Sequence, residues 1–147
     1  MEQCVSRHDI DRLDANQLKK IIRTGNEMIK ISKSPTVIPA QGIKPKMIEE
    51  FIGRVSSQTT AVSIARMKSP EGWEEPGQKP EFDEYSLVLR GTLKIETNED
   101  TYDIMEGEAV IVPRNEWVRY STPYAGGAEY ISVCLPAFSP HTVHRNR

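Results

Sequence analysis

The sequence predicts an all-β fold in which short antiparallel strands close into a jelly-roll barrel. From residue 59 onward, short runs rich in β-branched residues alternate with turn signals at roughly even spacing, as in sandwiches and barrels. Ten prolines and nine glycines are scattered along the 147 residues, which suits many short elements joined by turns. The runs 87–89 and 110–112 are apolar at every position, so we expect strands covered on both faces, in a closed jelly roll with the N-terminal arm or a second subunit packed outside.

Composition narrows the possible functions. The length suits one domain with a core, and a net charge of −2 does not favour nucleic acid or an anionic membrane as a partner. No apolar run is long enough to span a bilayer, and the polar start of the chain lacks the apolar stretch of a signal peptide. Cys4 and Cys134 are far apart and form no metal or disulfide pattern. We therefore expect a cytoplasmic protein in a reducing compartment.

Residues 1–48 are expected to form a helix and an extended arm, and residues 49–147 the barrel and a C-terminal tail. The helix is predicted over 13–27, where Asp14 can cap the free N–H groups of the first turn and Gly25 suits the position after the end. Its apolar face consists of three residues at helical spacing: Leu18, Ile21 and Ile22.

The arm follows over 33–46 and is punctuated by three prolines and a glycine. A short helical turn is predicted after it, over 46–53. Residues 69–80 are expected to be a loop, because they contain three prolines and two glycines. The remaining runs predict strands, with a short hairpin connection at 98–100: 59–68, 84–91, 92–97, 101–105, the end of 106–114, 116–123 and 128–136.

Two spaced patterns lie within these strands and resemble the two motifs of the cupins. Glu84, six residues and Gly91 match the second half of the first motif, G-x5-H-x-H-x3–4-E-x6-G. Gly107, five residues and Pro113 match the first half of the second motif, G-x5-P-x-G-x2-H-x3-N. The resemblance covers about residues 60–136. It implies a single-domain jelly roll with a ligand cavity inside.

The chain departs from these motifs at the metal ligands. The two histidine positions of the first motif hold Gln78 and Pro80, or Gly77 and Lys79 with the longer spacing, and the histidine of the second motif is Val118.

Asn115 replaces the motif's glycine and still tolerates a left-handed turn. Of the usual four ligands, the resemblance leaves only Glu84. Because transition metals in such sites are held mainly by imidazole, we expect no metal and no cofactor. The chain is similar in this respect to the histidine-poor cupins of the ethanolamine-utilisation Q type.

Glu84 is the first candidate for chemistry, because it stands where cupins have an inward-facing ligand. Period-2 alternation places Ser86 and Val88 on the same face. A carboxyl in a partly apolar cavity would have a raised pKa and could act as a general acid or base. The alternative is a solvated carboxylate at the end of a strand. Tyr120 should share the inward face of Val118, either as an acid or base or as a core tyrosine with its hydroxyl satisfied.

Further candidate ligand-binding residues surround this pair: Gln78, Ser86, Trp117, Tyr130 and Cys134. Cys134 has no predicted base nearby, so an inert buried thiol is the more natural interpretation. His141 and His144 in the tail could form a metal or anion site or lie at the surface.

The resulting hypothesis is a cupin that binds a small polar metabolite, with acid–base chemistry at Glu84. Two alternatives remain: a metal-dependent dioxygenase, isomerase or lyase with an unusual ligand set, and a non-catalytic sensor or scaffold. A homodimer is expected, because apolar outward strand faces need cover.

Overall fold

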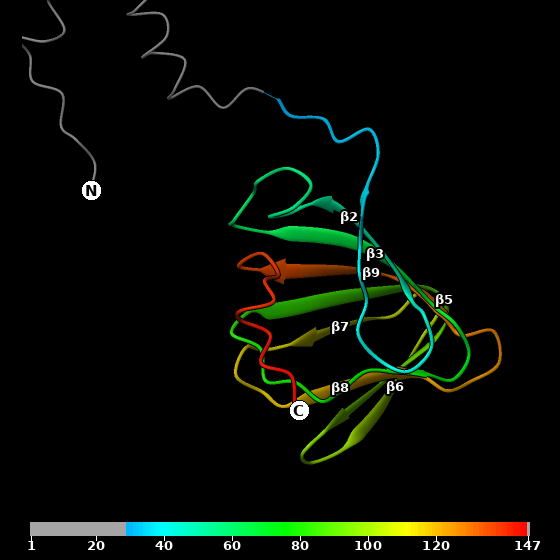
Figure 1. Cartoon of the computed structure of the whole chain (residues 1–147). Helices are drawn as coiled ribbons and strands as arrows, with labels where there is room; N and C mark the ends of the chain where they lie inside the picture. Colours follow the sequence, from blue (N-terminus) through cyan, green and yellow to red (C-terminus); the bar gives the residue numbers. More distant parts are fainter. Residues whose placement is uncertain (1–28, 147) are drawn as a thin grey trace, which may run out of the picture. The chain divides into compact units, whose positions relative to one another are not determined.

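The computed structural model describes residues 29–146. The helix predicted over 13–27 lies outside these residues. Within them the structure is all-β and antiparallel, and every strand lies in the second of the chain's two units, residues 32–147 (Figure 1). The strands are β1 (Thr36–Ile38), β2 (Met47–Ile52), β3 (Ser63–Ser69), β4 (Trp73–Glu74), β5 (Asp83–Thr97), β6 (Thr101–Met105), β7 (Ala109–Val112), β8 (Val118–Thr122) and β9 (Ala128–Leu135).

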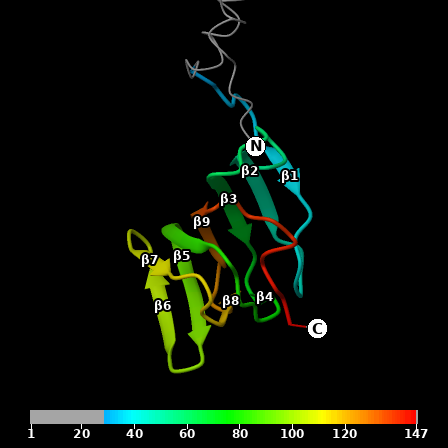
Figure 2. The same ribbon diagram turned by 90° about the vertical axis from the view of Figure 1, so that its left-hand side faces the viewer.

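The strands form a curled half-barrel. On one side the hydrogen-bonded order is β1-β2-β3-β9-β5-β7, and on the other it is β4-β8-β5-β6. β5 belongs to both sides. Its first half pairs with β7 and β9, and its second half pairs with β6 and β8. Figure 2 shows β5 running from the first group of strands into the hairpin with β6.

β5 bends between its two halves. The register with β9 shifts between Val88 and Arg90, and Gly91 follows with φ of 73°. A Cβ on Gly91 would overlap the carbonyl oxygen of Gly127. A glycine is therefore required at this position for two reasons: the positive φ, and the close approach of the β8–β9 connection.

The core lies on the concave side of this sheet. Its main cluster holds buried residues from β4, β5, β7, β8 and β9, among them Trp73, Leu93, Ile95, Val118 and Tyr120. A smaller cluster of Phe82, Cys134 and Val143, with Phe138 packed against it, attaches the C-terminal tail to the barrel. The tail therefore belongs to the folded structure and closes over the inner face of the sheet.

The inward alternation predicted for β5 is confirmed. Ser86 and Val88 are buried, while Tyr85, Leu87 and Leu89 are exposed. Ile111 of β7 is paired with Tyr85 and is also exposed, so an apolar strip lies on the outer face. Whether a second copy of the chain covers this strip stays a prediction.

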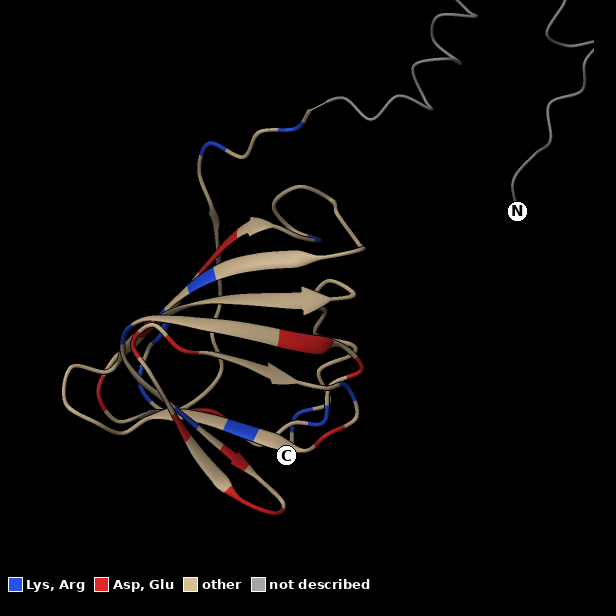
Figure 3. Ribbon diagram, turned by 180° about the vertical axis from the view of Figure 1, so that it is seen from behind, with Lys and Arg blue, Asp and Glu red and all other residues tan. Residues whose placement is uncertain are grey.

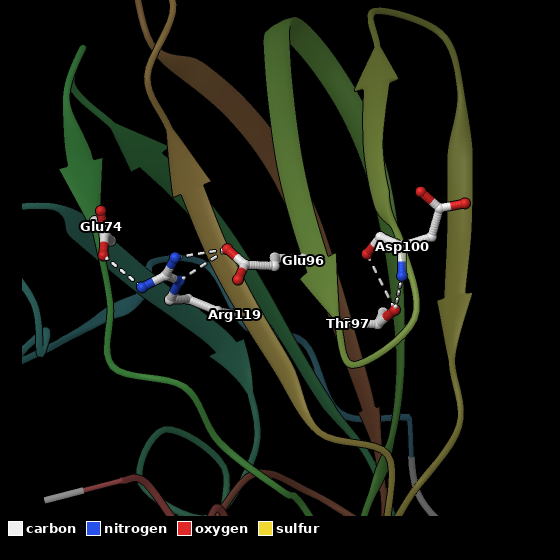
Figure 4. A network of polar contacts seen from close by, with 5 residues as sticks. All are labelled: Glu74, Glu96, Thr97, Asp100 and Arg119. Atoms are coloured by element: carbon white, nitrogen blue, oxygen red, sulfur yellow. Dashed lines mark hydrogen bonds and ion pairs between the residues drawn. The ribbon is translucent and has the colours of Figure 1, made fainter.

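Charged side chains elsewhere on the outside form local pairs. Lys and Arg are dispersed among Asp and Glu over the ribbon (Figure 3). Arg119 on β8 contacts Glu74 on β4 and Glu96 on β5, each through a guanidinium nitrogen, at 3.0 and 2.6 Å (Figure 4). These pairs connect three strands but are partly exposed, so each contributes little to stability. Within residues 29–146, no helix is long and apolar enough to cross a membrane.

The closed barrel predicted from the sequence is a curled half-barrel in the structure, and three further predictions differ as well. The strands expected at 84–91 and 92–97 are one continuous strand, because the bend at Gly91 does not interrupt the pairing. The loop 69–80 contains the short strand β4. The helical turn over 46–53 is wrong: Met47–Ile52 is strand β2, which is held by pairing with β1 and β3.

The two glycines of the motifs allow a matched test of the bend. Gly91→Ala should cost about 3 kcal/mol or more of unfolding free energy, because it adds an overlap with the backbone of Gly127 to the strain of a positive φ. Gly107 has a similar φ of 83°, but no atom lies within 4 Å of a Cβ there. Gly107→Ala should therefore cost only about 1 kcal/mol. Urea unfolding of both variants measures the difference, and equal losses would contradict a role of close approach at Gly91.

Candidate functional site

The inner face of the half-barrel contains a cavity of about 310 Å³. Its polar lining comes from segments far apart in sequence: Lys46, Glu50, Glu75, Gln78, Glu84, Tyr120, Tyr130, Ser132 and Arg145. Its apolar lining comes mostly from the first three strands and the tail region: Ile38, Ile48, Ala65, Met67, Phe82 and Phe138. The cavity can therefore accept a molecule with a polar part and an apolar part.

Glu84 lies at the start of β5, opposite Cys134 of β9 and Val112 of β7. The Ser132 hydroxyl donates a hydrogen bond of 2.8 Å to Glu84 Oε2. Burial, and next the negative charge of Glu75, raise the pKa of Glu84 to about 7, although Ser132, Lys46 and Arg145 favour the ionised form. Glu84 can consequently take up or release a proton near neutral pH.

Lys46 is one of the two cations among the described residues that line the cavity. Its side chain is only 5% exposed, and its Nζ lies 4.0 Å from Glu75 Oε2 and 3.9 Å from the centre of the Trp73 ring. Nζ also donates a hydrogen bond of 3.2 Å to the hydroxyl of Tyr130. Burial lowers the pKa of Lys46, but Tyr130 and Glu75 outweigh it, so the pKa lies above its usual value. Lys46 therefore stays an ammonium ion rather than becoming a nucleophile.

Glu75 is the second acid of the cavity, and it is buried. Burial raises its pKa, while Lys46 and Arg145 act in the opposite direction. Glu50 also lines the cavity, but its Oε1 accepts hydrogen bonds from the backbone N–H groups of Val55 and Ser56, at 3.0 and 2.9 Å. The carboxylate of Glu50 is thus used to fix the β2–β3 connection.

Three polar atoms of the cavity residues have no hydrogen-bond partner within the described part of the chain: Gln78 Oε1, Tyr120 Oη and Arg145 Nε. Burial, and next the charge of Glu84, raise the pKa of Tyr120 well above its usual value, so the phenol keeps its proton. Tyr120 and Arg145 are then donors without an acceptor, and Gln78 offers an acceptor without a donor. Buried groups of this kind ordinarily have partners, which makes them candidate ligand contacts.

The structure brings five of the seven sequence-predicted site residues to this cavity: Gln78, Glu84, Tyr120, Tyr130 and Cys134. Ser86 is buried but does not line the cavity, and Trp117 packs against Gly77 outside it. Burial raises the pKa of Cys134 well above its usual value, which fits an inert thiol. In the tail, His144 lies 2.8 Å from Glu81 at the surface and is not part of the cavity. The roles predicted for these residues stay predictions.

Sequence reasoning missed Lys46, Glu75 and Arg145. Lys46 precedes a strand that was predicted to be a helical turn, and Glu75 lies in a presumed loop. Arg145 lies in the tail, where only His141 and His144 are sequence candidates for a metal or anion site. Their proximity results from pairings between distant segments, such as the isolated bridges of Ile43 with Glu74 and of Gln78 with Arg145.

By sequence, the chain is similar to part of a curated protein. No protein-family model matches the chain. A curated relative, endoribonuclease YbeY of Myxococcus xanthus, is 46% identical over 99 residues, which are 67% of this chain and 34% of the relative. The chain thus spans about a third of the length of the curated relative that it matches.

Solved structures resemble the chain over most of its length. A predicted oxalate decarboxylase from Thermotoga maritima superposes with a TM-score of 0.60 at 18% identity, over 75% of this chain and 99% of the other. A protein assigned as ethanolamine utilization protein Q from Salmonella typhimurium gives 0.53 at 13%, over 71% and 97%. The polyketide cyclase RemF from Streptomyces resistomycificus gives 0.61 at 15%, over 83% and 86%. Identities this low show the fold alone.

The cavity does not fit the three-histidine metal site that the resemblance implies. Gln78 and Val118 occupy two of the histidine positions and are paired with each other by backbone hydrogen bonds. Within residues 29–146, no group of three or more His, Cys, Asp and Glu side chains could hold a metal ion. The ammonium of Lys46 stands beside Glu75, so a protein cation already compensates one of the two acids.

The metal prediction can be tested directly. Protein produced without a histidine tag should contain no stoichiometric Fe, Mn, Ni, Cu or Zn, because the imidazole ligands that these ions prefer are missing. Elemental analysis by mass spectrometry measures this, with a histidine-containing cupin purified in parallel as the positive control. About one metal ion per chain would contradict the prediction.

A second prediction concerns pH and stability. The pKa of Glu84 is about 7 in the folded protein against an ordinary value of 4.5, so the folded state binds more protons between these pH values. The contribution of Glu84 to stability should therefore fall as pH rises from about 4.5 through 7, by at most about 3 kcal/mol because the carboxyl faces a cavity. Glu84→Gln should lack this loss, and so gain stability relative to wild type at pH 8.

Thermal melts and urea unfolding from pH 4 to 8 measure the effect. Glu116 is exposed, so Glu116→Gln serves as a control and should keep the wild-type pH profile. If Glu84→Gln also followed the wild-type profile, Glu84 would be a solvated strand end.

Proposed function

We propose that this chain, whose described part has the cupin fold, binds a small polar metabolite in the cavity beside Glu84 and performs acid–base chemistry on it without a transition metal. The observation that carries the proposal is the carboxyl of Glu84, which has a pKa of about 7 and lines the same cavity as the unpartnered phenol of Tyr120. A group with this pKa is present in both protonation states at neutral pH, which general acid–base catalysis requires.

The proposed role of each cavity residue follows from its charge and its protonation state. Neutral Glu84 can donate a proton to a bound molecule, and its carboxylate can remove one. Tyr120 keeps its proton and can donate a hydrogen bond to an oxygen that becomes negative during the reaction. Ser132 donates to Glu84 Oε2, which fixes the orientation of the carboxyl group. Lys46 and Arg145 supply positive charge near both acids without being consumed.

The two alternatives are less well supported. A scaffold would fill its interior with its own side chains, whereas this one retains a cavity of about 310 Å³ with buried polar groups. A metal enzyme would need a ligand set that the described cavity residues do not offer. The endoribonuclease activity in the name of the curated relative is not proposed for this chain, because the match spans only 34% of that protein.

The test is a screen of small polar metabolites by thermal shift and ligand-observed NMR. Compounds that stabilise the wild type should bind Glu84→Gln and Tyr120→Phe at least about tenfold more weakly, or lose turnover, because each variant removes a hydrogen-bonding or proton-transfer group from the cavity. Circular dichroism should show that both variants keep the fold.

Tyr102 is half-exposed on β6, so Tyr102→Phe is the matched control and should bind as the wild type does. Equal binding by wild type and both cavity variants would place the ligand elsewhere and refute the proposal.

A further inference from the structure

The cavity has one cation that forms no ion pair with any described residue. It is lined by two cations, Lys46 and Arg145, and by two acids whose carboxylates are not fixed by backbone N–H groups, Glu75 and Glu84. Lys46 is 4.0 Å from Glu75, which assigns that pair to each other. Glu84 is neutral in about half of the molecules at pH 7 and in most of them at pH 6. Arg145 forms no ion pair or side-chain hydrogen bond with any described residue, although a guanidinium always carries its charge.

Arg145 is held at the cavity by its backbone. The tail runs beside the loop after β4, where the N–H of Asn146 donates to the carbonyl of Gly77 at 2.7 Å and the N–H of Lys79 to that of His144 at 3.1 Å. Gln78 forms an antiparallel bridge with Arg145 itself. These contacts do not involve the guanidinium, so they place the side chain without using its hydrogen-bonding capacity.

The side chain of Arg145 lies between the polar and apolar parts of the cavity lining. Its guanidinium carbon is 5.7 Å from the centre of the Phe138 ring, and the Phe138 ring is 5.8 Å from that of Phe82. Its positive charge favours the ionised forms of Glu75 and Glu84. Its Nε is buried without an acceptor within the described residues. Arg145 is therefore a charged cavity-lining residue whose hydrogen-bonding capacity is not used by the described residues.

We propose that the ligand is a small carboxylic acid bound as its anion, with Arg145 as the residue that selects the carboxylate. This inference rests on the proposed function, because it names the ligand class of the same cavity. A carboxylate fits a guanidinium better than any neutral oxygen does, since both partners are charged and planar. The phenol of Tyr120 is a second free donor for a carboxylate oxygen.

The remaining lining defines the rest of the molecule. Gln78 Oε1 needs a donor, which a hydroxyl or an N–H group on the ligand would provide. The rings of Phe82 and Phe138, with Ile48 and Met67, offer an apolar surface for a short aliphatic or aromatic body. A hydroxy acid with one ring combines these features, so mandelate is a suitable probe.

The experiment compares acids with amides of the same shape. Mandelate and mandelamide, and phenylacetate and phenylacetamide, are titrated into the full chain by calorimetry at pH 6. The wild type should bind each acid at least about tenfold more tightly than its amide, because the amide offers no charge to the guanidinium. Arg145→Gln should abolish this preference, and Arg145→Lys should restore part of it.

Arg90 provides the matched control. It is exposed on β5 and does not line the cavity, so Arg90→Gln removes one positive charge from the protein without changing the site. This variant should keep the preference for acids. A loss of preference in Arg90→Gln equal to that in Arg145→Gln would attribute the effect to net charge and overturn the role of Arg145.

The pH dependence gives an independent readout. As pH rises from 6 to 8, Glu84 loses its proton and repels a bound anion, so the affinity for mandelate should fall by up to about tenfold per pH unit above 7, while that for mandelamide changes little. The variant Glu84→Gln should show no such fall. The other titratable groups that line the cavity around Glu84 are Lys46, Glu50, Glu75, Tyr120, Tyr130, Cys134 and Arg145.

The outcomes separate this inference from the proposed function. Acids and amides that bind equally well, with binding still weakened by Tyr120→Phe, would overturn the carboxylate and leave the site in place. Acid preference that survives in Arg145→Gln would overturn the role of that residue. No binding of either class at millimolar concentration, in a protein that binds other metabolites, would also refute the carboxylate, and no binding of any compound would refute the site.

Discussion

The close contact between the backbones of Gly91 and Gly127 is the constraint on which the rest of the structure depends. It lets a single 15-residue strand, β5, bend and take part in both sides of the half-barrel. Near its start Glu84 is paired with Cys134, and its far half pairs Ile95 with Tyr120 of β8. The carboxyl of the candidate site therefore lies on this strand, and the phenol lies on a neighbouring strand that pairs with its far half. A straight strand would place them on surfaces that diverge, because a sheet without such a bend does not curl far enough to enclose a cavity.

Part of this arrangement can be predicted from the sequence, because it depends on residues that are neighbours in the chain. Alternation along residues 84–89 correctly identified which side chains of β5 point inward, since the period of a strand is a property of the strand itself. The positive φ of Asn115 was expected from its place in the motif and is observed at 65°. Gly91 matches a glycine of the first motif, and the sequence alone predicts a boundary between two strands there. A glycine that bends a strand and a glycine that ends one leave the same signal in a sequence.

The charges of the cavity were not predictable in this way. Lys46 reaches the cavity because β2, which it precedes, pairs with β3. Glu75 reaches it because the segment after β4 is hydrogen-bonded to β8, and Arg145 because the tail pairs with Gln78. Each pairing joins segments that are distant in sequence, and none of the three residues stands in a recognisable pattern. Buried charged groups have no compositional signature of their own, since the same residues in the same segments would be unremarkable at a surface.

Lys46 and Arg145 supply positive charge for Glu75 and Glu84, the two cavity acids that backbone N–H groups do not fix. A metal ion would otherwise be the usual source of positive charge at such a place, and it would hold nearby carboxylates ionised. An ammonium over the Trp73 ring is a weaker and more distant compensation, so the balance is incomplete: Glu75 has a cationic neighbour, and Glu84 has a pKa of about 7. Proton exchange at neutral pH follows from this incomplete neutralisation. Arg145 forms no ion pair with either acid, and for this reason we propose its guanidinium as the group that binds an anionic ligand.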